Sequence, residues 1–186
     1  MRLTFIAAVF AILPVDAWAQ NCATLWTARN MVYYAAGHCF NSALARDVFS
    51  NEGCSSAELT AAEREMIAWV RAREAALGCA INPNSTASEA GIPTVIDRYR
   101  GLTAIPFETG QLSQCRNYRG PELAAHTGLR RSSHVIGSPP QGANLYFRYR
   151  DFGGWVFVQW DNPDGTNGLF GWVEDFANTP RVCDPS

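Results

Sequence analysis

The 186-residue sequence contains no lysine, and its charges nearly balance. All 15 basic residues are arginines, and with 17 acidic residues they give a net charge of -2 at neutral pH. The arginines are scattered, so neither half has the basic stripe that nucleic acid requires or a polybasic run suited to anionic lipid. We therefore expect no nucleic-acid partner.

Metal-ligating patterns are also missing. No Cys-x-x-Cys spacing occurs, and the three histidines, His38, His126 and His134, are scattered along the chain. Zinc sites usually show such residues at short, paired spacings. The sequence thus predicts no metal site and no cofactor.

Long apolar runs are absent after the N-terminus. Arg2 precedes the short apolar run Leu3–Val15, and Ala17-Trp18-Ala19 has the pattern of a cleavage site. This predicts a signal peptide over residues 1–19 and a mature chain that starts at Gln20 and is periplasmic or secreted. The alternative is a buried N-terminal helix. No transmembrane segment is expected in the mature chain.

Six cysteines follow that site, and an even number in an exported chain predicts three disulfides. Fifteen connectivities are possible for six cysteines, and the sequence alone does not choose among them. Spacing favours Cys22–Cys79 and Cys39–Cys54 in the first half, and Cys115–Cys183 across the second.

The tripeptide Gly37-His38-Cys39 admits two interpretations. A cysteine beside a histidine suggests nucleophilic catalysis, which needs a free thiolate. In an oxidising compartment the sulfur is expected in a bridge instead, with Gly37 ending a helix. We favour the bridge.

Residues 20–80 have helical periodicity. Thr60 and Glu63 fit a capping box, and the helix that follows stops at Gly78. Ser42 is placed to cap a short helix through Phe49. Residues 81–114 are rich in Asn, Ser, Thr, Gly and Pro at first, so we expect a linker followed by an ambiguous segment.

In residues 115–186, successive side chains are expected to alternate between two faces, as they do in β-strands. Leu145, Phe147 and Tyr149 are expected on one face, and Tyr146, Arg148 and Arg150 on the other. Several short strands with glycine-rich turns predict a small barrel. The fold class expected is therefore α+β, a bridged helical domain followed by a barrel.

The second half resembles the bacterial SH3-like (SH3b) family. The motifs that carry the resemblance lie between Glu122 and Phe176, and they are Gly128-Leu129-Arg130, His134-Val135-Ile136-Gly137, Gly142, Gly154-Trp155 and Gly171-Trp172-Val173. The resemblance implies an SH3-like barrel that binds cell-wall peptides or proteins.

The first half resembles the YARHG domain, a small extracytoplasmic bacterial module. Ala28-Arg29-Asn30, Tyr33, Gly37 and Phe40 match its pattern. Tyr34-Ala35-Ala36 replaces the family's Ala-Arg-His before the glycine, so no role of that Arg-His pair is carried over.

Aromatic residues are too numerous for the interior of a small barrel, so some are expected on an exposed binding surface. Arginines on the Tyr146 face are suited to hold a carboxylate or stack on a ring. The alternative is an ordinary solvated strand face. The candidate ligand-binding residues are Tyr146, Arg148, Tyr149, Arg150, Trp155, Trp160 and Trp172.

These features predict an exported, non-enzymatic protein that binds a cell-envelope ligand, either a peptidoglycan peptide or a protein partner. One alternative is an inhibitor or immunity-type partner of a secreted enzyme. Another is a wall hydrolase acting through a free Cys39 or a pair among Glu52, Glu58 and Glu63. The oligomeric state is left open.

Overall fold

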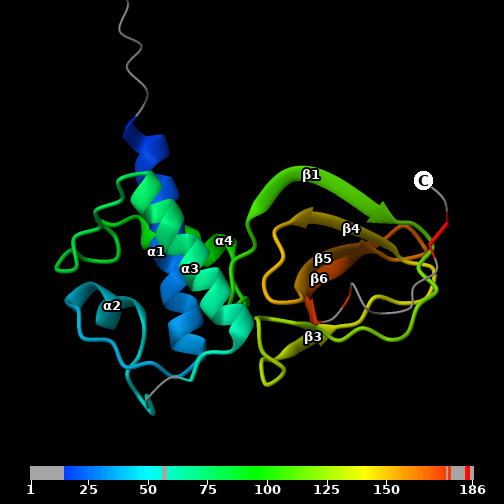
Figure 1. Ribbon diagram of the computed structural model, residues 1–186, viewed down its shortest axis with the longest axis horizontal. Helices are drawn as coiled ribbons and strands as arrows, with labels where there is room; N and C mark the ends of the chain where they lie inside the picture. The colour runs from blue at the N-terminus through cyan, green and yellow to red at the C-terminus, as the bar shows by residue number, and fades with distance from the viewer. Residues whose placement is uncertain (1–14, 56–57, 175, 177–182, 185–186) are drawn as a thin grey trace, which may run out of the picture.

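The computed structural model describes residues 15–55, 58–174, 176 and 183–184, which form helices at one end of the molecule and strands at the other (Figure 1). The helices are α1 (Val15–Ala35), α2 (Ala43–Val48), α3 (Ala61–Ala76) and α4 (Ile92–Arg98). The strands are β1 (Glu108–Cys115), β2 (Ala125–His126), β3 (Val135–Gly137), β4 (Asn144–Tyr149), β5 (Trp155–Asp161) and β6 (Asn167–Glu174).

Most of the predicted signal peptide, residues 1–14, lies outside the described residues. Helix α1 begins at Val15 and runs through the proposed cleavage site, so cleavage before Gln20 stays a prediction. Within the described part of the chain, no helix combines the length and the apolar character needed to cross a membrane.

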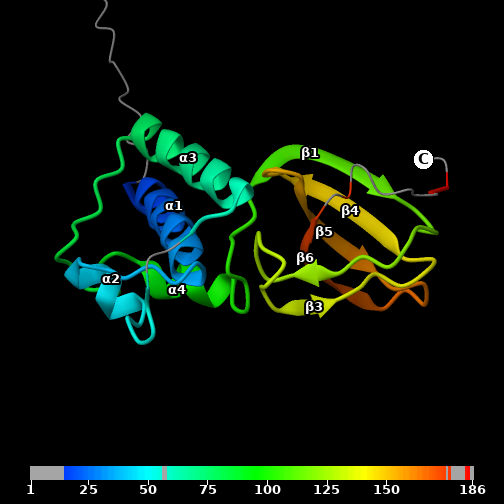
Figure 2. The same ribbon diagram turned by 60° about the horizontal axis from the view of Figure 1, so that its bottom comes forward.

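The helical end is built around α1 and α3, which lie side by side (Figure 2). The predicted capping box starts α3: Thr60 Oγ1 accepts from the Glu63 amide, and Glu63 Oε2 accepts from the Thr60 amide. Gly78, in the left-handed region at φ 65°, follows its end. Ser42 caps α2 as predicted.

Three disulfides hold the chain, and they are the pairs that spacing favours. Cys22–Cys79 ties α1 to the end of α3, and Cys39–Cys54 closes the segment that contains α2. Cys115–Cys183 joins the end of β1 to the C-terminal segment.

Residues 81–114 were expected as a linker followed by an ambiguous segment, and the second part forms α4 and the start of β1. Helix α4 packs against α1, and Ile92 and Val95 on it are buried. Leu102 and Ile105 are buried after it, and β1 begins at Glu108, before the expected boundary at Cys115. The segment is thus part of the fold.

The strands form one antiparallel sheet in the order β1-β4-β5-β6-β2-β3. The α+β class is confirmed, but the sheet is open, with β1 and β3 at opposite edges, so the closed SH3-like barrel is not formed. The helices lie at one end of this sheet (Figure 1), where residues of α1 and α3 share a core with Trp155, Phe157 and Trp172.

The central strand β5 is buried on both faces. Trp155 and Phe157 join the core that contains the apolar residues of α1 and α3, whereas Val156, Val158 and Trp160 join a second core on the opposite face. A strand covered on both sides has a nearly continuous apolar sequence, as this one does. The helical half and the sheet therefore share one core.

Candidate ligand-binding face

The helices cover one end of their face of the sheet and leave the other end open. On β6, Trp172 is fully buried in the shared core, whereas Phe170, two residues earlier, is 42% exposed. On β5, Phe157 is buried and Gln159 is half-buried. The uncovered part is the end farther from the helices, toward the β5–β6 turn (Figure 2).

Strand register places five side chains on this open end. Tyr146 of β4 pairs with Gln159 of β5, and Gln159 pairs with Phe170 of β6, so the three form one row across the sheet. Arg148 and Asp161 follow Tyr146 and Gln159 at a spacing of two residues and share their face. We call these five residues, Tyr146, Arg148, Gln159, Asp161 and Phe170, the distal face.

The distal face is hollowed. A cavity of about 320 Å³ is lined by all five residues, together with Trp160 and the segment 167–169. A smaller hollow of about 170 Å³ adjoins it, since Gln159 and Phe170 line both. The combined volume lies in the range of small-ligand sites.

Arg148 has an unsatisfied donor in this hollow. Its Nε is buried and has no hydrogen-bond partner among the described residues, and its guanidinium makes no ion pair with them. Buried polar groups are normally paired, because leaving a donor without an acceptor costs about 1–3 kcal/mol. This Nε is closed to solvent, so a ligand in the hollow would contact the accessible part of the half-buried Arg148 side chain.

Tyr146 and Asp161 supply the polar rim of the hollow. The Tyr146 hydroxyl donates to Asp161 Oδ2 at 2.9 Å. This hydrogen bond is the main reason that the pKa of Tyr146 is raised above its ordinary value, and burial adds to it. The contact holds the Asp161 carboxylate beside the hollow.

Three of the predicted binding residues are buried, and this corrects the expectation that their rings are exposed. Trp155, Trp160 and Trp172 are 3%, 4% and 0% exposed. Trp172 Nε1 donates to the Ala104 carbonyl, which belongs to the segment after α4. Trp155 and Trp172 are core residues because they pack with residues of α1, α3 and the segment 102–105, whereas Trp160 packs in the second core.

Tyr149 and Arg150 lie at the junction with the helices. The Tyr149 ring packs edge-on against Phe157, and desolvation by that packing is the main reason that its pKa is raised. The Arg150 guanidinium lies 5.6 Å from the ring centre of Trp69 on α3 and 5.8 Å from that of Phe152. Of the seven predicted residues, only Tyr146 and Arg148 therefore belong to the distal face.

Sequence reasoning missed Gln159, Asp161 and Phe170. The signal for them was present in the tight turn Asn162-Pro163-Asp164-Gly165, which predicts a hairpin and so brings the strands on either side together. A hairpin drawn through that turn places Gln159 within two residues of Phe170, and a register shift between Gln159 and Asp161 gives the observed pairing.

Two residues of the catalytic alternatives, Cys39 and Glu63, have structural partners, whereas Glu52 and Glu58 are exposed. Cys39 is bonded to Cys54, so no thiolate is available there. Glu63 is buried and forms an ion pair with Arg130. Within the described residues, no group of three or more His, Cys, Asp or Glu side chains is placed to hold a metal ion.

Two residues that match the YARHG pattern, Arg29 and Asn30, make contacts that stabilise the fold. Arg29 pairs with Glu74 of α3, and the Asn30 side chain donates to the Trp26 carbonyl within α1. Both contacts brace the helical end.

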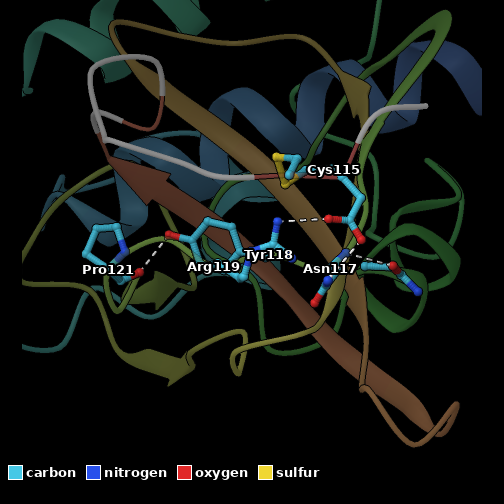
Figure 3. The surroundings of a disulfide bond; sticks show 8 residues. Cys115, Asn117, Tyr118, Arg119 and Pro121 are labelled. Carbon is cyan, nitrogen blue, oxygen red and sulfur yellow. Dashed lines mark hydrogen bonds and ion pairs between the residues drawn. A yellow bond between two sulfur atoms is a disulfide. The ribbon is translucent and has the colours of Figure 1, made fainter.

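The Cys115–Cys183 bridge fixes the chain end beside β1 (Figure 3). Asp184 accepts from Asn117 at 2.9 Å and from Arg119 at 2.8 Å. Tyr118 between them is buried and donates to the Pro121 carbonyl. These contacts close the core opposite the helices.

Two family matches cover the chain. The family described as Domain of unknown function (DUF4453) matches residues 78–186, and the YARHG domain matches residues 8–75. The YARHG resemblance is thereby confirmed, whereas the SH3b resemblance gains no support. No curated protein and no solved structure matches the chain. The boundary between the two matches falls at the end of α3, so the second match includes α4, which packs against α1, as well as the sheet.

Proposed function

Since the chain belongs to the family described as Domain of unknown function (DUF4453), with a YARHG domain before it, we propose that it is an exported binding protein without catalytic activity. Its ligand is a peptide component of the cell envelope, and the distal face is the surface that binds it. Three disulfides and the YARHG domain are compatible with a place outside the cytoplasm.

The observation that carries this proposal is Arg148, which lines an open hollow beside an exposed ring and has no ion-pair partner among the described residues. A guanidinium matches the planar geometry of a carboxylate, which envelope peptides carry at their ends and on side chains. Phe170, 42% exposed, offers apolar contact next to it. An exposed aromatic beside polar groups is typical of a binding surface.

The test uses the mature chain from Gln20 and purified wall sacculi. We expect the sacculi to retain the wild-type protein in a sedimentation assay. Arg148→Gln should weaken retention by roughly tenfold, since a hydrogen bond to a charged group contributes about 1.5–3 kcal/mol. Phe170→Ala should have a similar effect, since burying a phenylalanine side chain contributes about 1.5–3 kcal/mol. Phe170→Ala removes about as much exposed aromatic surface as its control below.

Two control variants match these changes at a distance from the distal face. Tyr34→Ala removes an aromatic ring that is 45% exposed on α1, and Arg100→Gln removes an exposed arginine. Both should bind as the wild type does. The proposal fails if sacculi and envelope extracts retain none of the wild-type protein. A single stoichiometric protein partner from the extract would replace it with the inhibitor alternative.

A further inference from the structure

The distal hollow is lined by two opposite charges that do not neutralise each other. Arg148 and Asp161 both line it, and neither takes part in an ion pair among the described residues. Two unpaired charges of opposite sign at one hollow are complementary to a ligand that carries both.

The spacing of the two charges follows from the strand register. Asp161 pairs with Asn144, and Arg148 lies four residues farther along β4. At about 3.3 Å per strand residue, the Cα atoms of Arg148 and Asp161 are separated by roughly 13 Å along the strand. Side chains on strands stand roughly perpendicular to the sheet, so much of this separation remains between the two charges and leaves room for a ligand of one or two residues.

The side chains between the charges suit the middle of such a ligand. Gln159 offers an amide that can donate to and accept from a peptide group. Phe170 offers an apolar surface for a small side chain, and it extends into the adjoining hollow. The Tyr146 hydroxyl donates a hydrogen bond to Asp161 Oδ2, and this contact fixes the orientation of the carboxylate.

We propose that the distal hollow binds a short zwitterionic peptide, with its carboxylate on the Arg148 guanidinium and its ammonium on the Asp161 carboxylate. This inference rests on the proposed function, because it names the part of the envelope ligand that the distal face recognises. It predicts that both ligand charges are required together.

The probe is alanyl-alanine, as the L,L and D,D isomers, titrated into ¹⁵N-labelled mature protein and followed by NMR. At least one isomer should shift amide signals of β4, β5 and β6 near the distal face. The N-acetylated dipeptide, which lacks the ammonium, and the dipeptide amide, which lacks the carboxylate, should each bind at least about tenfold more weakly.

Variants test the same pairing from the protein side. Arg148→Gln and Asp161→Asn should each weaken binding of the free dipeptide by about tenfold, because each removes one charge-assisted contact. Arg100→Gln and Asp97→Asn make the same charge changes in an exposed ion pair on and just after α4, and they should leave binding unchanged. The blocked dipeptides need no variant, so the test holds even if a variant fails to fold.

The outcomes separate this inference from the proposed function. If the blocked and free dipeptides bind equally, or if neither isomer shifts the distal face, the zwitterion proposal is overturned even where sacculi retain the protein. If the free dipeptide binds as described while sacculi and extracts retain none of the protein, the zwitterion proposal for the distal hollow is supported and the proposed envelope function is wrong.

Discussion

Glu63 on α3 and Arg130 after β2, 67 residues apart in the sequence, form a two-pronged ion pair with Nε–Oε1 and Nη2–Oε2 distances of 2.7 Å. Glu63 is 2% exposed, and the same carboxylate completes the capping box of α3. Hydrogen bonding to Glu63 is the main reason that the pKa of Arg130 is raised above its ordinary value. The pair thus joins the start of a helix to the sheet.

Removing Arg130 should destabilise the protein more than neutralising Glu63. Arg130→Gln leaves a buried carboxylate without its partner, which costs about 3 kcal/mol. Glu63→Gln keeps the cap, since glutamine also serves at that position, and leaves a cation that water can reach, so its cost is about 1–2 kcal/mol. Urea unfolding measures both free energies.

The matched control for this pair is Arg100→Gln, which breaks an exposed ion pair with Asp97. Surface pairs contribute at most about 1 kcal/mol. If Arg130→Gln and Arg100→Gln have equal effects on the free energy of unfolding, the Glu63 contact does not join the two halves.

Gly153 should be the glycine that least tolerates a side chain at the junction. A Cβ there would lie 2.7 Å from the Ala62 Cα on α3, and its φ is 52°. Gly165 has a φ of 77° with open space around it. Gly165→Ala therefore reports left-handed strain alone, about 1 kcal/mol, whereas Gly153→Ala adds a backbone clash and should cost at least about 2 kcal/mol more. Equal losses in thermal or urea unfolding would contradict the close approach of helix and sheet.

Short sequence patterns predicted several of the helices and strands, whereas the position of the candidate site depends on packing between residues far apart in the sequence. The capping box at Thr60, the cap at Ser42 and the end of α1 before Gly37 depend on a few neighbouring residues, so the sequence contained them. The strands β5 and β6 followed from apolar runs and a tight turn.

The burial of the aromatics could not be predicted in the same way. Alternation shows that Trp155 and Phe157 share a face, but it does not show that α1 and α3 cover that face. The same limit applies to Glu63: nearby residues predicted its capping box, but its ion-pair partner Arg130 lies on a distant segment. Which end of the sheet stays open, and so where the candidate site lies, depends on how far those helices extend.

Removing the Cys22–Cys79 disulfide should cost more stability than removing the Cys39–Cys54 disulfide. Cys22–Cys79 spans 57 residues and Cys39–Cys54 spans 15. Constraint of the unfolded chain predicts losses of about 4 and about 3 kcal/mol for the two double Cys→Ala variants. Alkylation of the native protein should label no thiol before reduction and six afterwards. A thiol at Cys39 that labels without reduction would contradict the bridge and restore the nucleophile hypothesis.

Asp151 should limit stability at neutral pH. Burial, with a contribution from Glu65, raises its pKa above the ordinary value of 3.8 although Arg150 lowers it. A carboxyl with a raised pKa in the folded state favours folding while protonated, so stability is present below about pH 3.8 and is lost as the pH rises through the folded pKa. Asp151→Asn should thus have a higher melting temperature than the wild type at pH 7, with the difference vanishing near pH 3.

Asp184 is the control, because its contribution to stability should change with pH in the opposite direction. Hydrogen bonds from Asn117 first, and then from Arg119, lower the pKa of Asp184. Its contribution to stability is therefore present above about pH 3.8 and is lost as the pH falls through the folded pKa. Asp184→Asn should melt below the wild type at pH 7 and approach it in acid. If both variants shift the melting temperature in the same direction at pH 7, desolvation does not govern Asp151.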